Sequence, residues 1–95
     1  MTRKVVKILG RSYAVEILES LGKQPKRFVD LKDVCKSNRT RTVRLKELKG
    51  EGLIAATPKM LGDRAYTFYE ITPLGKRALE LVRNFVQLNE KGRIP

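Results

Sequence analysis

The sequence contains no histidine, no tryptophan and only one cysteine, Cys35. A single cysteine cannot form an internal disulfide, and without histidine the common Cys/His zinc sites cannot be assembled. The missing histidine also removes the most frequent general base and excludes a Ser-His-Asp triad. The carboxylates are scattered along the chain and form no acid–base pair. We therefore expect no enzyme activity, no metal ion and no other cofactor, and we interpret Cys35 as a buried structural residue.

Acidic residues are also scarce, with 10 against 21 basic ones and a net charge of +11 over 95 residues. A chain of this length predicts a single domain, residues 1–95. So much positive charge repels itself in the compact state and favours an anionic partner, such as nucleic acid, an acidic protein or a membrane surface.

Long apolar runs are missing too, and no segment is long enough to span a membrane. The first residues, MTRKVVKILGRS, are basic and then apolar, but Lys7 interrupts the apolar stretch and Gly10 ends it. This pattern is typical of a short amphipathic helix and not of a signal peptide. We therefore expect a cytoplasmic protein that does not bind membranes.

Hydrophobic periodicity and turn residues predict the order of the elements. We expect helices at 3–9 and 12–21, a short extended piece at 27–29, helices at 31–36 and 39–49, strands at 53–57 and 65–71 around a loop at 58–64, and a last helix from Pro73 to about Asn89. Two short helices around a tight turn, followed by a two-stranded hairpin, form a winged helix-turn-helix. The predicted fold class is α+β, mostly helical, with a two-stranded wing and a C-terminal dimerisation helix at 73–90.

Three polar residues are candidate helix caps. Asp30 and Ser37 precede the helices predicted at 31–36 and 39–49, and serine and aspartate are preferred N-caps. Thr72 precedes Pro73, and proline is favoured at the first helical position. These caps define the helix–turn–helix and the start of the last helix.

The helix at 39–49 concentrates positive charge, although neighbouring like charges weaken an isolated helix by a few tenths of a kcal/mol per pair. On a wheel of about 3.6 residues per turn, Leu45 and Leu48 lie on one side with Arg41 beside them. The opposite side, with Lys49 at its edge, carries cations, a hydroxyl and one small apolar group: Arg39, Thr42, Val43 and Lys46. Such side chains match the base edges of a DNA major groove, and DNA phosphates would neutralise the repelling charges.

A run of basic residues is often only a solvated helix face. Here the run follows a helix and a turn, a hairpin with its own cations comes next, and the whole chain is basic, which together favour DNA. We expect Arg39, Thr42, Val43 and Lys46 to read bases, and Asn38, Arg44 and Lys49 to contact phosphates. We expect the wing at 58–65 to reach toward the minor groove with Lys59 and Arg64.

Four stretches resemble the winged-helix transcription regulators of the HxlR type and, more loosely, the MarR and ArsR types. SNRTRTVRLKELKGEGLI at 37–54 is similar to that family's Ser-x-Arg-Thr…Leu-Lys-Glu-Leu…Gly-Leu pattern. KRFVDL at 26–31, ILGRSYAVEIL at 8–18 and YEITPLGKRAL at 69–79 resemble its Arg-Phe-x-x-Leu segment, its long first helix and its Thr-x-x-Gly junction into the final helix. The resemblance implies a winged helix that binds DNA.

The sequence departs from this family in two ways that bear on function. Arg41 occupies a position that is commonly apolar in the family, so either its aliphatic stem packs inward or the helix is slightly rotated. The family's redox-sensing cysteine near the N-terminus is missing, so the resemblance gives no support for thiol sensing.

The last helix carries an apolar stripe at spacings of three and four: Leu74, Ala78, Leu81, Val82, Phe85 and Leu88. A domain of this size needs only part of the stripe for its own core, and the remainder would form an exposed patch of the kind that marks association. We therefore expect a homodimer paired through these helices. The alternative is that the helix packs entirely on its own domain.

The sequence thus predicts a sequence-specific, double-stranded DNA-binding transcription regulator, with the helix at 39–49 in the major groove. Two alternatives remain open: a weakly specific protein that coats DNA, and a winged helix used as a protein-interaction module. A small-molecule effector is not indicated by any motif.

Overall fold

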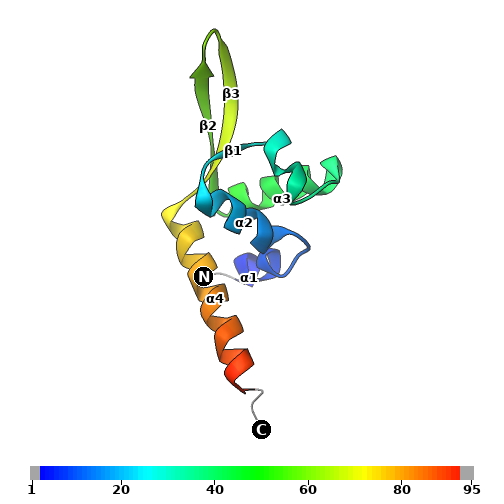
Figure 1. Cartoon of the computed structure of the whole chain (residues 1–95). Coiled ribbons are helices and arrows are strands. Elements are labelled where there is room, and N and C mark those ends of the chain that lie inside the picture. The colour runs from blue at the N-terminus through cyan, green and yellow to red at the C-terminus, as the bar shows by residue number, and fades with distance from the viewer. Residues whose placement is uncertain (1–2, 93–95) are drawn as a thin grey trace.

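The computed structural model describes the backbone of residues 3–92 and the side chains of residues 3–87. Its elements are α1 (Arg3–Leu9), α2 (Ala14–Lys23), β1 (Lys26–Arg27), the 3₁₀ helix η1 (Val29–Asp33), α3 (Asn38–Gly50), β2 (Ile54–Leu61), β3 (Arg64–Ile71) and α4 (Pro73–Gly92). Figure 1 shows a helical body from which the β2–β3 hairpin and α4 project in opposite directions. The molecule is therefore elongated, at 59 × 25 × 22 Å, and the predicted winged helix-turn-helix is confirmed.

The core lies where α1, α2, η1, α3 and the start of α4 meet. Its buried residues are Val5, Ile8, Ala14, Ile17, Leu18, Leu21, Leu31, Leu45, Leu48, Leu53, Ile54, Ala78 and Leu79. Helices α1, α2 and α3 contribute residues three or four positions apart, as a single buried helix face requires. In α3 the pair Leu45 and Leu48 points into this core, which turns the opposite side of the helix outward.

The three strands form one antiparallel sheet in the order β1-β3-β2. Strands β2 and β3 pair along their whole length, from Ile54 opposite Ile71 to Leu61 opposite Arg64. Only Gly62 and Asp63 connect them. Gly62 has φ +65°, and a glycine with positive φ at the first of two turn positions is typical of a type II′ hairpin.

The predicted loop at 58–64 is therefore wrong, because residues 58–61 belong to β2 and residue 64 begins β3. Proline has no N–H to donate and is disfavoured inside a paired strand. However, β2 is an edge strand with a neighbour on one side only, and an edge strand tolerates a residue without an N–H. The wing is consequently a long, fully paired hairpin.

The helix predicted at 31–36 is also wrong, because the chain forms the 3₁₀ helix η1 two residues earlier. Asp30 does not cap it. Its carboxylate instead accepts a hydrogen bond from the backbone N–H of Arg27 at 3.0 Å and pairs with the Arg27 guanidinium at 3.4 Å. The backbone hydrogen bond, followed by the side-chain bond from Arg27, lowers the pKa of Asp30. Because the Asp30 carboxylate is bound by Arg27, it does not cap the helix that follows.

The caps of α3 and α4 agree with the prediction. The Ser37 hydroxyl accepts from the Thr40 N–H at 3.2 Å, and α4 begins at Pro73. Helix α2, in contrast, begins at Ala14 and not at Ser12, because Tyr13 takes a left-handed conformation with φ 69°. That turn leaves the Ser12 carbonyl available to a partner from α3.

The junction between β3 and α4 is tightly packed against the residues that follow α3. The Thr72 hydroxyl accepts from the Gly75 N–H at 3.0 Å and donates to the Gly52 carbonyl at 2.6 Å, and the Thr72 N–H donates to the Leu53 carbonyl at 3.1 Å. A Cβ at Gly75 would lie only 2.0 Å from that same Leu53 oxygen. The glycine of the Thr-x-x-Gly junction thus allows the first turn of α4 to contact the backbone of Leu53.

Candidate nucleic-acid interface

The outward side of α3 presents the residues that the helical wheel had grouped together. Arg39, Thr42, Val43 and Lys46 are all exposed, and Val43, at 41%, is exposed enough for its methyl groups to contact a partner. The Thr42 hydroxyl donates to the Asn38 carbonyl at 2.8 Å, so its oxygen remains able to accept a hydrogen bond. Lys49, also exposed, extends the positive surface toward the end of the helix.

A hollow of about 200 Å³ lies between this side of α3 and the base of the wing. Its lining includes Thr42, Lys46 and Lys49 from α3, and Tyr69 from β3. Part of the outward side of α3 and the base of the wing therefore border the same hollow. Two lysines stand at this surface, and no carboxylate is among its lining residues within the described part of the chain.

Arg44, which we expected to contact a phosphate, is instead bound within the protein. Its side chain is only 15% exposed and pairs with the Glu47 carboxylate at 3.0 Å, while its Nε donates to the Ser12 carbonyl at 2.8 Å. Glu47 in turn pairs with Arg11 at 3.0 Å. Arg44 therefore connects α3 to the loop between α1 and α2. No local pattern predicts this contact, because Arg44 and Ser12 are 32 residues apart.

Arg41 is buried to an extent that the sequence did not predict. The residue is 2% exposed, so the guanidinium lies inside the protein together with its aliphatic stem. Nη1 donates to the Cys35 carbonyl at 2.6 Å, Nη2 donates to the Asn38 side-chain oxygen, and the guanidinium carbon lies 4.2 Å from the centre of the Phe28 ring. The buried Nε has no partner among the described residues. Asn38, expected to contact phosphate, is thus held by Arg41 through its oxygen.

The two predicted wing cations have different surroundings. Lys59 pairs with Glu70 at 2.9 Å and lies 5.3 Å from the centre of the Phe68 ring. Arg64 is exposed beside the turn and forms no ion pair with any residue that the structure describes. Next to it, Met60 and Leu61 are exposed, so the tip of the wing combines one cation with apolar side chains.

The apolar stripe of α4 divides between the core and the solvent. Ala78 is completely buried within its own domain, so its predicted role in a dimer interface is wrong. Val82 is half-buried, whereas Leu74, Leu81 and Phe85 are exposed, Phe85 to 68%. Leu88 lies outside the residues whose side chains are described. The side of α4 that faces away from the core therefore leaves apolar side chains in water.

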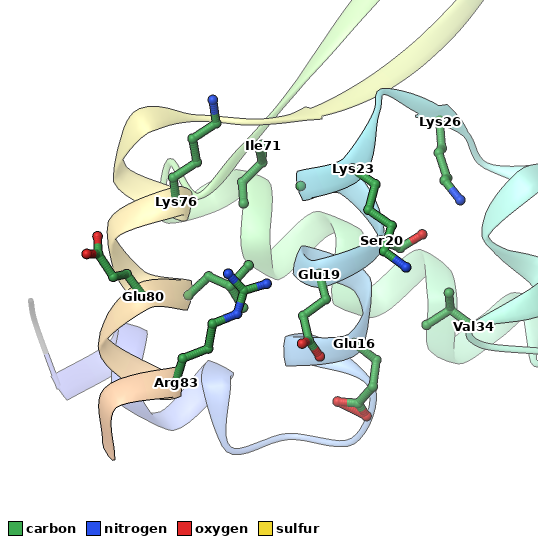
Figure 2. Close-up of a pocket in the computed structure, with 12 residues that line it drawn as sticks. Glu16, Glu19, Ser20, Lys23, Lys26, Val34, Ile71, Lys76, Glu80 and Arg83 are labelled. Atoms are coloured by element: carbon green, nitrogen blue, oxygen red, sulfur yellow. The ribbon is translucent and has the colours of Figure 1, made fainter. Parts of the chain in front are cut away.

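A groove of about 850 Å³ runs between α2 and α4. Figure 2 shows Glu16 and Glu19 on the α2 wall, and Lys76 and Arg83 on the α4 wall. The lining also includes three apolar residues, Val34, Ile71 and Leu79. Because charges of both signs surround the groove, its electrostatics select neither an anionic nor a cationic ligand.

Cys35 is buried, as expected. The described residues contain no cluster of three or more histidine, cysteine, aspartate or glutamate side chains that could hold a metal ion. In the same part of the chain no helix combines the length and the apolar character needed to cross a bilayer.

Comparison with known proteins confirms the resemblance seen in the sequence. The model of the HxlR-like helix-turn-helix family matches residues 8–93. The crystal structure of diamide-treated YodB from B. subtilis superposes with a TM-score of 0.83 at 20% identity, covering 100% of this chain and 98% of that one. The reduced form of the transcriptional regulator YodB from B. subtilis gives a TM-score of 0.76 at 25% identity, with 93% and 89% covered.

A third similar structure is the redox regulator HypR in its reduced form, with a TM-score of 0.75 at 19% identity, covering 94% of this chain and 89% of that one. No curated protein sequence matches this chain. The similar structures agree on the winged-helix regulator fold over nearly the whole chain.

Proposed function

Because this chain belongs to the HxlR-like helix-turn-helix family, we propose that it is a transcription regulator that binds double-stranded DNA sequence-specifically. The observation that carries this proposal is the exposed side of α3, which presents cations, a hydroxyl and a small apolar group, and from which Thr42 and Lys46 line a hollow shared with the base of the wing. The net charge of +11 supports an anionic partner. We expect this regulator to bind DNA in the cytoplasm.

In this proposal α3 lies in the major groove. Arg39 and Lys46 donate hydrogen bonds to guanine O6 and N7. Thr42 forms a hydrogen bond with a base edge, and Val43 contacts a thymine methyl group. Lys49, at the edge of this side, contacts a phosphate. Arg44 is not part of the proposed interface, because its donors are engaged by Ser12 and Glu47.

The wing contributes mainly through Arg64. An arginine beside a hairpin turn suits the minor groove, whose negative potential is strongest where the groove is narrow. Lys59 contributes less, because it would have to leave Glu70 first. An exposed ion pair of this kind is worth at most about 1 kcal/mol, so Lys59 can be released to a phosphate at a small cost that Arg64 does not have.

We further propose that the chain acts as a homodimer through the exposed part of α4. Leu74, Leu81 and Phe85 form an apolar surface that the domain itself does not cover, and such surfaces mark association sites. A two-fold axis along these helices would place two copies of α3 about 34 Å apart, one turn of DNA. The preferred site would then be palindromic.

The proposal is tested by comparing Arg39→Ala, Lys49→Ala and Lys23→Ala on a preferred duplex and on a random duplex. Arg39→Ala should weaken the preferred duplex by about 1–3 kcal/mol and relax sequence choice. Lys49→Ala should weaken both duplexes alike and lower the salt slope by about one unit. Lys23, an exposed cation at the end of α2, is the matched control, and its loss should change neither.

Two results would contradict this assignment. Equal, sequence-blind losses for Arg39→Ala and Lys49→Ala would mean that α3 does not read bases. Binding of random duplex within about tenfold of any selected duplex would favour a DNA-coating protein instead, since specific regulators discriminate by a factor of roughly a thousand or more.

A further inference from the structure

The side chain of Arg41 connects three segments that meet at the helix–turn–helix. Its guanidinium stacks on Phe28, which precedes η1, at 4.2 Å. It donates to the carbonyl of Cys35, in the turn, at 2.6 Å. Its other terminal nitrogen donates to the side chain of Asn38, the first residue of α3. One buried group thus fixes the position of α3 relative to the turn.

This arrangement does not maximise the free energy of unfolding. A guanidinium keeps its positive charge in a protein, yet Arg41 forms no ion pair with any described carboxylate, and its buried Nε lacks a partner. Replacing a buried ion by an apolar residue of similar volume is often neutral or stabilising. An apolar residue of similar length would fill the same space without an unpaired donor. The burial of a charge at this site therefore indicates a requirement other than stability.

We propose that Arg41 is a positioning residue that orients the first turn of α3 for DNA, an inference that rests on the proposed function. Because the Asn38 oxygen accepts from Arg41, the amide NH₂ of Asn38 is the end of the side chain that remains for a partner. Asn38 is exposed, and an NH₂ group is suited to donate to a phosphate oxygen. Arg41 thereby makes Asn38 a fixed donor next to Arg39, the first of the proposed base contacts.

A methionine at position 41 would occupy the same volume but could not hold the Cys35 carbonyl or the Asn38 side chain. The buried Cys35 carbonyl would then lose its side-chain donor, and the exposed Asn38 side chain would be free to rotate. The fold should persist, because the apolar contacts of α3 through Leu45 and Leu48 are unchanged. What should be lost is the fixed geometry of the DNA-contacting turn, and with it the contacts that depend on that geometry.

The test uses the full chain, the variants Arg41→Met and Asn38→Ala, and the double variant. Each is measured on a duplex enriched by the wild type from a random library and on a random duplex of the same length. Arg41→Met should still unfold cooperatively, at a somewhat lower temperature because the buried Cys35 carbonyl loses its donor, and should bind the enriched duplex about tenfold more weakly, with a smaller loss on the random duplex. The double variant should lose no more than Arg41→Met alone, because Asn38 acts through Arg41.

A purely structural role makes different predictions. Wild-type affinity and preference in a folded Arg41→Met chain would overturn the proposal, and so would losses from Arg41→Met and Asn38→Ala that multiply as independent effects. If Arg41→Met does not fold, Phe28→Leu replaces the ring beneath the guanidinium by another apolar side chain that can still pack against the core. It should give a smaller loss of the same kind on the enriched duplex, and an unchanged preference would overturn the proposal.

Hydrogen exchange separates this proposal from the proposed function. Without DNA, the amides of residues 38–41 should exchange faster in Arg41→Met than in the wild type, while those of α2 should not change. A wild-type chain that bound no duplex at low salt would reject the proposed function alone. The positioning role would still be rejected by unchanged exchange at residues 38–41.

Discussion

The contact between Gly75 and Leu53 gives the most sharply defined prediction for stability. In Gly75→Ala the new methyl carbon would lie 2.0 Å from the Leu53 carbonyl oxygen, 3.0 Å from its carbonyl carbon and 2.8 Å from Cγ1 of Ile71. Favourable carbon contacts begin at about 3.5 Å. The first turn of α4 must therefore move by an ångström or more, and neither partner is a flexible side-chain end.

The size of the effect follows from what that movement disturbs. Overpacking of a buried site destabilises by about 1–3 kcal/mol. The same displacement strains the cap formed by Thr72, and a lost N-cap costs about 0.5–2 kcal/mol. We expect Gly75→Ala to lower the free energy of unfolding by about 2–4 kcal/mol. For a domain of this size that corresponds to a fall in Tm of roughly 10–30 °C.

Gly50→Ala is the matched control. No atom lies within 4 Å of a Cβ at that position, and Gly50 lies within α3. The same substitution there should stabilise the protein by about 0.4–1 kcal/mol, because alanine has fewer unfolded conformations to lose. Thermal unfolding is followed by circular dichroism at one fixed protein concentration, since association shifts the apparent Tm. A Gly75→Ala chain that melts within a few degrees of the wild type would refute the packing of α4 described above.

Three further outcomes are expected. Arg64→Ala should weaken DNA binding most on sites flanked by A·T tracts, as measured by fluorescence anisotropy; equal losses on all flanks would remove the wing from the minor groove. Leu81→Glu combined with Phe85→Glu should convert a sedimenting dimer into a monomer, and a wild type that already sediments as a monomer at tens of micromolar would exclude the dimer. The hydrogen bond from the Arg27 backbone N–H lowers the pKa of Asp30 below the ordinary value of an aspartate, so the ionised carboxylate stabilises the fold at neutral pH and this contribution is lost as the pH falls through the folded-state pKa. Asp30→Asn should therefore lower Tm slightly at pH 7, with a difference that shrinks below about pH 4; a difference independent of pH would contradict this.

Features set by local signals were predictable from the sequence. The predicted helix at 39–49 differs from α3 by one residue at each end, because Ser37 provides a side-chain cap and Gly52 follows the helix with a positive φ. The start of α4 followed from Thr72 and Pro73 in the same way. In each case neighbouring residues decide the conformation, so the sequence pattern contains the information.

Features that depend on distant partners were not predictable. Pro58 is tolerated within β2 because β2 pairs on one side only. The local sequence cannot reveal which strand lies at the edge of a sheet. The contacts of Arg41 and Arg44 in α3 were not predictable for the same reason. The helical wheel separated Arg41 from the outward side, but it could not show that the guanidinium would find Phe28 and Cys35, or that Arg44 would reach Ser12.

The central claim is that α3 reads DNA sequence, and selection from a random duplex library tests it most directly. The wild-type full chain is incubated with the library at moderate salt, and bound duplexes are amplified and sequenced over several rounds. We predict enrichment of one palindromic motif with half-sites about one helical turn, roughly 10 base pairs, apart. No enrichment above the input library, or no bound duplex even at low salt, would contradict the claim.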